Sequence, residues 1–304
     1  MAVGYNAGVQ KILIVGSGDI ARRILSRLAR RYRVYAVLRD MGQAAAWRAL
    51  GATPVYADLD DHRSLQRLVG LADYVLHLAP PPGEGPGDPR TRRLLAALGK
   101  GKSLPRRLVY VSTTGVYGDC RGAAVDETRR LKPENARAVR RVDAERRLRA
   151  WGRQSGVAVS ILRAPGIYAA DRLPVERLQK GLPALVETDD VFTNHIHADD
   201  LAAACVAALR HGQANRTYNA VDDSDLKMAD YFDRVADAFA LPRPPRLARA
   251  EAAERLSPVQ LSFMRESRRI GNRRLKNELK LRLAYPTVDV GIADALARRN
   301  ACSS

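Results

Sequence analysis

The stretch KILIVGSGDIARRIL, Lys11 to Leu25, decides the fold. Its apolar start, Lys11–Val15, predicts a buried strand, and the apolar spacing over 20–31 predicts an amphipathic helix. Between them, Gly16-Ser-Gly18-Asp-Ile-Ala21 matches the GxGxxA turn of dinucleotide-binding folds. The first glycine permits the sharp turn, the second lets the backbone approach a pyrophosphate, and Ala21 lets helix and strand pack closely. Free N–H groups at the helix N-terminus then bind the phosphate.

The remaining apolar runs alternate with helical patterns as far as residue 163. Strands are predicted at Arg33–Leu38, Thr53–Ala57, Tyr74–Leu78, Arg107–Ser112 and Val157–Arg163. Helices are predicted at Gly42–Leu50, His62–Val69, Thr91–Gly99 and Glu134–Gln154. Continuous apolar strands separated by amphipathic helices predict a parallel sheet covered on both faces. We therefore expect a Rossmann-like, doubly wound α/β core over residues 1–165.

The pattern becomes irregular after this core. Helices are expected at Asp199–Arg210, Met228–Ala240 and Ala250–Glu254, and a further helix with a turn before Pro286 is expected in the segment NRRLKNELKLRLAYPT. We interpret residues 166–304 mainly as a smaller C-terminal substrate lobe, interleaved with returning core elements.

Composition narrows the class of protein. The chain has 304 residues, and 51 Lys and Arg against 33 Asp and Glu give it a net charge of +18. The arginines are spread along the chain and form no basic tail, so we expect an anionic small-molecule partner and not a nucleic acid. Three widely spaced cysteines, Cys120, Cys205 and Cys302, predict neither a disulfide framework nor a zinc site. No apolar run is long enough for a membrane span and no secretory signal is apparent, so a cytoplasmic location is expected.

Residues after the second and third strands indicate the cofactor. Arg39 stands at the end of the second strand and Asp40 follows it. An acidic side chain there binds the ribose hydroxyls of NAD, whereas an arginine accommodates the additional phosphate of NADP. Arg39 therefore favours NADP, with NAD as the alternative. Asp58 and Leu59 follow the third strand, where a carboxylate can accept from an adenine amino group and leucine can cover the ring.

The chain resembles the extended short-chain dehydrogenase/reductase family, in its epimerase/dehydratase-like branch. The resemblance rests on GSGDIA at Gly16, DL at Asp58, YVLHLAPPP at Tyr74, LVYVSTTGVYGD at Leu108, ILRAPGIYA at Ile161, NHIHADDLA at Asn194 and YNAVDD at Tyr218. It implies a Rossmann core, a small substrate lobe, and a threonine, Thr113, that binds a substrate oxygen. The implied cofactor-binding residues are Gly16, Ser17, Gly18, Asp19, Ile20, Arg39, Asp58, Leu59, Leu78, Ala79 and Pro80. It also implies dimerisation through the helices at Thr91–Gly99 and Glu134–Gln154, but the arginines of the second leave the oligomeric state open.

The chain departs from this family at its catalytic pair. The family uses a Tyr and a Lys four residues apart on one helix face, and the equivalent positions here are Arg137 and Arg141. An arginine stays protonated near neutrality, so Arg137 cannot transfer the proton that the tyrosine would. Arg137 could instead clamp an anionic substrate or stabilise developing negative charge, and Arg141 could hold the ribose. The alternative is that both belong to an exposed, arginine-rich helix face.

Another tyrosine, or Thr113 beside a bound water, could supply the missing proton transfer. Tyr117 is the nearest candidate by the family's geometry and Tyr168 lies on the opposite wall, although packing is the more common role at both positions. His195 and His197 stand near Asp199 and Asp200, where we expect support of a loop and a helix cap and not a metal site.

The chain is therefore predicted to be an NAD(P)-binding oxidoreductase or epimerase-like protein of the atypical short-chain type, with an unidentified small substrate. The alternative is a protein that senses NADP(H) without catalysis.

Overall fold

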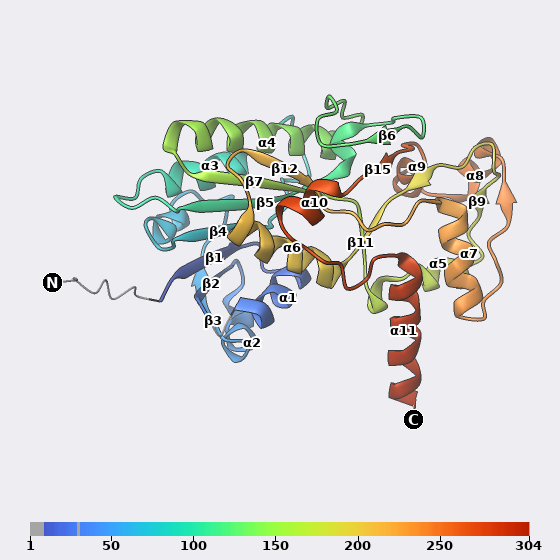
Figure 1. The fold of residues 1–304 in the computed structure, drawn as a ribbon, viewed down its shortest axis with the longest axis horizontal. Coiled ribbons are helices and arrows are strands. Elements are labelled where there is room, and N and C mark those ends of the chain that lie inside the picture. The colour runs from blue at the N-terminus through green and yellow to red at the C-terminus, as the bar shows by residue number, and fades with distance from the viewer. Residues whose placement is uncertain (1–8, 29–30, 304) are drawn as a thin grey trace.

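The computed structural model describes residues 9–28 and 31–303, with a seven-stranded parallel sheet at its centre (Figure 1). The strand order is β12-β7-β5-β4-β1-β2-β3. The strands are β1 (Lys11–Val15), β2 (Arg33–Leu38), β3 (Ala52–Tyr56), β4 (Tyr74–His77), β5 (Arg107–Thr113), β7 (Ala158–Ala164) and β12 (Arg216–Asn219). The order runs outward in both directions from β1 and β4, which is the doubly wound α/β fold predicted from the sequence.

Helices cover both faces of the sheet because alternate residues of each strand point to opposite sides. In β1, Ile12 and Ile14 pack into the cluster that holds α1 (Asp19–Leu28) and α6 (Ala198–His211). Leu13 and Val15 pack into the cluster that holds α3 (Pro89–Leu98) and α4 (Ala136–Ser155). Every side chain of β1 after Lys11 is therefore buried, as a continuous apolar run requires.

The second half of the chain builds a smaller body beside the carboxyl ends of β5 and β7, at the right of Figure 1. It contains α5 (Val175–Gln179), α7 (Met228–Ala238), α8 (Arg249–Arg255), α9 (Pro258–Phe263) and α11 (Val288–Ser303), with the short strand pairs β8 (Gly166–Tyr168) with β11 (His195–His197), β9 (Ala184–Leu185) with β14 (Arg246–Leu247), and β10 (Phe192–Thr193) with β13 (Leu226–Lys227). The chain returns to the core at α6, at β12 and at α10 (Arg273–Glu278), and β15 (Arg269–Ile270) pairs with β6 (Ala124–Val125).

Several predicted elements differ from the structure. The helix predicted at His62–Val69 is a 3₁₀ segment, η2 (Ser64–Leu68). The helix predicted at Gly42–Leu50 divides into η1 (Met41–Gln43) and α2 (Ala44–Ala49), because the Asp40 carboxylate accepts from Gly42 N and tightens the first turn. The helices α9 and α11 were not predicted. Of the helix predicted over 20–31, residues 29–30 lie outside the described residues, as does the side chain of Cys302.

Within residues 9–28 and 31–303, the structure contains no helix with the length and apolar character of a membrane span.

Candidate functional site

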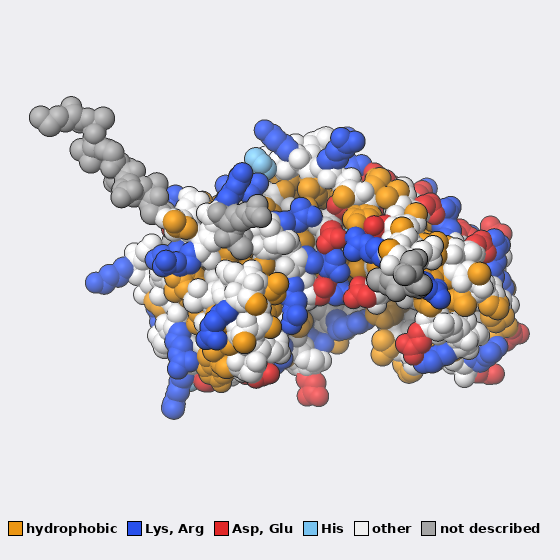
Figure 2. Space-filling view, turned by 90° about the horizontal axis from the view of Figure 1, so that it is seen from below, with side chains coloured by type: hydrophobic (Ala, Val, Ile, Leu, Met, Phe, Trp, Pro, Cys, Tyr) orange, Lys and Arg blue, Asp and Glu red, His pale blue; other side chains and the backbone are white. Residues whose placement is uncertain are grey.

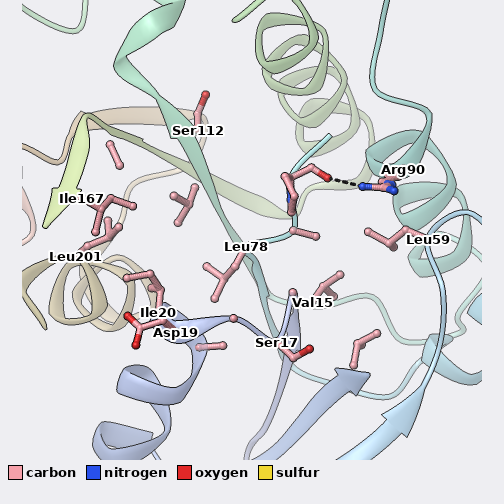
Figure 3. Close-up of a pocket in the computed structure, with 18 of the residues that line it drawn as sticks. Val15, Ser17, Asp19, Ile20, Leu59, Leu78, Arg90, Ser112, Ile167 and Leu201 are labelled. Atoms are coloured by element: carbon pink, nitrogen blue, oxygen red, sulfur yellow. Dashed lines mark hydrogen bonds between the residues drawn. The ribbon is translucent and has the colours of Figure 1, made fainter. Parts of the chain in front are cut away.

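A cavity of about 600 Å³ lies at the carboxyl ends of the strands, where the order reverses between β1 and β4 (Figure 3). Open α/β sheets bind their ligands at this position. The structure brings every residue predicted to bind the cofactor to the wall of this one cavity: Gly16, Ser17, Gly18, Asp19, Ile20, Arg39, Asp58, Leu59, Leu78, Ala79 and Pro80.

The two glycines of the first turn serve different purposes. Gly16 has φ +106°, and a Cβ built on it would stand 2.4 Å from the backbone nitrogen of Ala79. The turn after β1 therefore touches the chain that leaves β4, and a side chain at Gly16 has no room. A Cβ on Gly18 would meet no atom within 4 Å. Gly18 thus leaves space at the N-terminus of α1, where N–H groups are free to bind phosphate.

Arg39 and Asp40 are neighbours in the sequence, but only Arg39 lines the cavity. Arg39 lines the cavity, is exposed, and makes no hydrogen bond or ion pair with the described residues. Asp40 caps η1 through Gly42 N at 2.8 Å and does not line the cavity. The Arg39 guanidinium is therefore available to a ligand in this cavity, whereas the Asp40 carboxylate already accepts a hydrogen bond from the backbone.

Two further arginines, which the sequence analysis did not single out, also line the cavity. Arg90 donates to the Asp60 carboxylate at 2.5 Å. It also donates to the Pro80 carbonyl oxygen at 3.3 Å, and this second bond is the dashed line in Figure 3. Arg172 reaches from the second half of the chain to Asp19 at 2.8 Å. Arg90 follows the proline–glycine loop, which was one signal for it. Nothing local marks Arg172, because its role depends on the lobe folding back over the first turn.

Thr113 and Arg141 stand at the inner end of the cavity. The Thr113 Oγ1 accepts from Gly115 N at 3.2 Å, which leaves its own O–H free to donate. Arg141 donates through one nitrogen, Nη1, to the Tyr110 hydroxyl at 2.9 Å and to the Val111 carbonyl oxygen at 2.8 Å. Its guanidinium is thereby fixed on the wall with its other N–H groups unused.

A second cavity, of about 470 Å³, continues from the first toward the C-terminal lobe. The two cavities share Thr113, Pro165, Ile167, Arg141 and Arg172. Arg137, one helical turn before Arg141, lines only the second cavity, where its guanidinium lies 4.9 Å from the ring centre of Phe263. Arg141 is thus half-buried and lines both cavities, whereas Arg137 is exposed on α4 and also lines the second cavity.

The comparisons with known proteins agree with this architecture. The model of the NAD dependent epimerase/dehydratase family matches residues 12–220. The chain belongs to this family. A structure of a conserved protein of unknown function from Silicibacter pomeroyi is 29% identical, with a TM-score of 0.78 over 95% of this chain and 99% of that one. A short-chain dehydrogenase/reductase superfamily protein from Agrobacterium tumefaciens, solved with bound NAD, is 21% identical, with a TM-score of 0.75 over 96% and 98% of the two chains, and it supports the fold alone.

One curated relative matches part of the chain. A GDP-6-deoxy-D-mannose reductase from Pseudomonas aeruginosa is 28% identical over 181 residues, which are 53% of this chain and 59% of the reductase. The match thus spans little more than half of either protein. The epimerase/dehydratase family uses a pyridine nucleotide, and neither the family nor this relative identifies the substrate of the present chain.

In this member of the family, Tyr117 lies outside both cavities. Its side chain is 1% exposed, and its hydroxyl donates to Asn219 Oδ1 at 2.7 Å and accepts from Arg163 Nη1 at 2.9 Å. Burial raises the pKa of Tyr117. Arg163 in turn pairs with Glu145 at 2.7 Å, and Glu145 also accepts from the Ser112 hydroxyl at 2.7 Å. Tyr117 is therefore part of a buried hydrogen-bond network and does not line either cavity.

The histidines are also held by the fold. His77 Nε2 is 2.8 Å from the Thr91 hydroxyl, and burial lowers the pKa of His77 to about 3, so its ring is neutral. His197 Nδ1 accepts from Asp199 N at the start of α6, as a helix cap. The Asp200 carboxylate accepts from two backbone N–H groups at 284 and 285. Among the described residues there is no cluster of His, Cys, Asp and Glu that could hold a metal ion.

The buried carboxyl group of Asp222 should make the free energy of unfolding depend on pH. Burial, with Asp223 and Asp200 nearby, raises the pKa of its carboxyl to about 7, and Oδ2 has no partner within the described chain. The folded protein then binds one more proton than the unfolded chain between about pH 4 and pH 7, so stability falls as pH rises through this range. We expect urea denaturation to show a loss on the order of 2–4 kcal/mol between pH 5 and pH 8, and Asp222→Asn to remove most of it. An equal pH dependence in the Asp222→Asn variant would contradict this.

Proposed function

We propose that the protein is an NADP-dependent oxidoreductase or epimerase-like enzyme of the atypical short-chain type, acting on a small molecule. The observation that supports it most is the cavity at the strand switch point, whose wall includes both the glycine turn and Arg39. The residues present fit a dinucleotide: Gly18 leaves open space at a helix N-terminus, and Arg39 on the wall of the same cavity has no hydrogen bond or ion pair among the described residues. NADP, when bound, supplies or accepts a hydride.

The chain's own residues would bind, orient and polarise. The first turn of α1 binds the pyrophosphate, Arg39 the phosphate on the adenosine ribose, and Asp58 and Leu59 the adenine. Arg141, fixed by Tyr110 and Val111, donates to the second ribose. Thr113 donates its free O–H to a substrate oxygen, and Arg137 stabilises negative charge at that end. Since an arginine cannot release a proton near neutrality, the proton on that oxygen comes from solvent or from another group.

The first test compares substitutions of two arginines: Arg39, which directly follows β2, and Arg33, which begins that strand. Replacing Arg39 by Ala removes a charge-assisted contact worth about 1.5–3 kcal/mol, so we expect NADP to bind about 10–100-fold more weakly while NAD affinity stays unchanged. Calorimetric titration of both nucleotides measures this. Arg33→Ala, an exposed arginine at the other end of the same strand, is the matched control and should change neither affinity. Equal losses for NAD and NADP in Arg39→Ala would refute the choice of NADP.

A second function, sensing of NADP(H) without catalysis, is favoured by one observation. The family's Tyr–Lys pair is replaced by Arg137 and Arg141, and the hydroxyl of the nearest tyrosine, Tyr117, is enclosed in its own network. NADPH that binds but is not oxidised in the presence of a broad panel of carbonyl compounds would support this alternative. Stereospecific hydride transfer to any of them would support the enzyme.

A further inference from the structure

The charges in the second cavity are not balanced. Glu266 accepts from Arg268 at 2.6 Å and from Asn135 Nδ2 at 3.1 Å, so the carboxylate on this wall is fully engaged. Arg172 is paired with Asp19 outside the cavity. Two guanidiniums remain without a carboxylate among the described residues, those of Arg137 and Arg141. A cavity with this balance attracts an anion and repels a cation.

The two unpaired arginines are not equivalent. Arg141 also lines the first cavity and is bound to the Tyr110 hydroxyl and the Val111 carbonyl oxygen. Arg137 lines the second cavity alone and makes no hydrogen bond with the described residues; it contacts the ring face of Phe263. A ring face is a weak partner for a guanidinium compared with a carboxylate, which accepts two parallel N–H bonds. Arg137 therefore has its full donor capacity available to a ligand.

Part of the cavity wall is apolar and aromatic. Phe192, Met228, Tyr231 and Phe263 line it, and the rings of His195 and Tyr231 are 4.2 Å apart. Burial lowers the pKa of His195 to about 4, so this imidazole is neutral at physiological pH and adds no charge. Phe263 is 54% exposed at the cavity's edge, which leaves much of its surface uncovered. Such a surface stabilises a flat apolar group.

We propose that the second cavity binds a small carboxylate with a flat apolar or aromatic body, its carboxylate held by Arg137 and its body placed against Phe263 and the His195–Tyr231 pair. A phosphate monoester is the less suitable anion, because it carries up to two charges and three acceptor oxygens. Of the arginines that line this cavity, Arg137 alone has no hydrogen bond or ion pair within the described residues, and one such guanidinium matches a single carboxylate. This assignment rests on the proposed function for its reaction, but not for its binding.

The test measures binding and needs no turnover. Phenylacetate is titrated by calorimetry into the full-length protein, with and without saturating NADP, beside two matched probes: phenylacetamide, which lacks the charge, and acetate, which lacks the ring. We expect phenylacetate to bind at least tenfold more tightly than either. Arg137→Gln should weaken phenylacetate at least tenfold and leave phenylacetamide unchanged, and Arg137→Lys should lie between Arg137→Gln and wild type.

Control variants distinguish phenylacetate binding in the second cavity from a nonspecific effect of the protein's net charge and from binding of NADP. Arg146→Gln changes the same charge at an exposed position of the same helix and should bind phenylacetate as wild type does. Phe263→Ala should weaken both aromatic probes. The inference is overturned if phenylacetate does not bind at about 20 mM, which is ~20 times a Kd of about 1 mM. It is also overturned if phenylacetamide binds equally well, or if Arg137→Gln has no effect. Failure of wild-type protein to bind NADP would instead sink the proposed function and leave this inference standing.

Discussion

Replacing Gly16 by alanine will abolish measurable NADP binding. Alanine at φ +106° is strained, and its Cβ would stand 2.4 Å from the Ala79 nitrogen and 2.8 Å from the Leu78 carbonyl carbon. Both are backbone atoms of the segment that leaves β4, so neither can rotate away as a side chain would. The turn must shift, and it carries the N–H groups that would bind the pyrophosphate. We expect at least about a 100-fold loss of NADP affinity and a loss of about 3 kcal/mol or more in the free energy of unfolding.

Substitutions at two other glycines distinguish the effect of backbone strain from the effect of a steric clash. Gly85 has φ +87°, and a Cβ there meets nothing within 4 Å, so Gly85→Ala should cost only about 1–2 kcal/mol and keep wild-type NADP affinity. Gly18→Ala should fold normally, because its Cβ also meets no protein atom, yet weaken NADP binding by standing where the pyrophosphate approaches. Calorimetry and urea denaturation give both quantities for all three variants. If Gly16→Ala binds NADP normally, the turn is not the phosphate site.

Glu145→Gln will destabilise the fold strongly. Glu145 and Arg163 are 2% and 3% exposed in their side chains, and two nitrogens of Arg163 donate to the two carboxylate oxygens, at 3.1 and 2.7 Å. A neutral amide leaves the arginine charge buried without its counter-ion, and breaking such a pair costs about 3–5 kcal/mol. It also loosens Ser112, which lines the first cavity and donates to Glu145. Urea denaturation at neutral pH measures the loss.

Two further variants test the role of Tyr117 and provide a control for Glu145→Gln. Tyr117→Phe removes one hydroxyl from the same network and should cost about 1–3 kcal/mol with NADP affinity retained. Glu176→Gln removes an exposed carboxylate paired with Lys180 and should leave stability unchanged. A Tyr117→Phe protein of wild-type stability that lost NADPH oxidation would favour the catalytic role that the sequence suggested. A Glu145→Gln protein as stable as Glu176→Gln would show that the buried pair contributes nothing.

Local patterns predicted most of the core. Lys11–Val15 forms β1 at the predicted bounds, because five apolar-rich residues before a glycine turn suit a strand buried on both faces. The 62–69 segment was wrong as an α-helix: Ser64 Oγ bonds to backbone groups at Asp58 and Asp61, which favours a tighter turn. In the lobe, short strands such as Ala184–Leu185 are too brief to leave a periodic signal.

The sequence by itself determined the glycine turn, the parallel sheet and the residues gathered at its carboxyl edge, since each depends on contacts between near neighbours and on the constant period of a strand or helix. Only the tertiary structure decided which charges stay free. Whether Arg137 lines a cavity, whether Arg172 reaches Asp19 and whether Tyr117 is enclosed all depend on partners brought from distant parts of the chain. The side chain alone sets a group's charge and donors, but its neighbours in space determine whether they remain available.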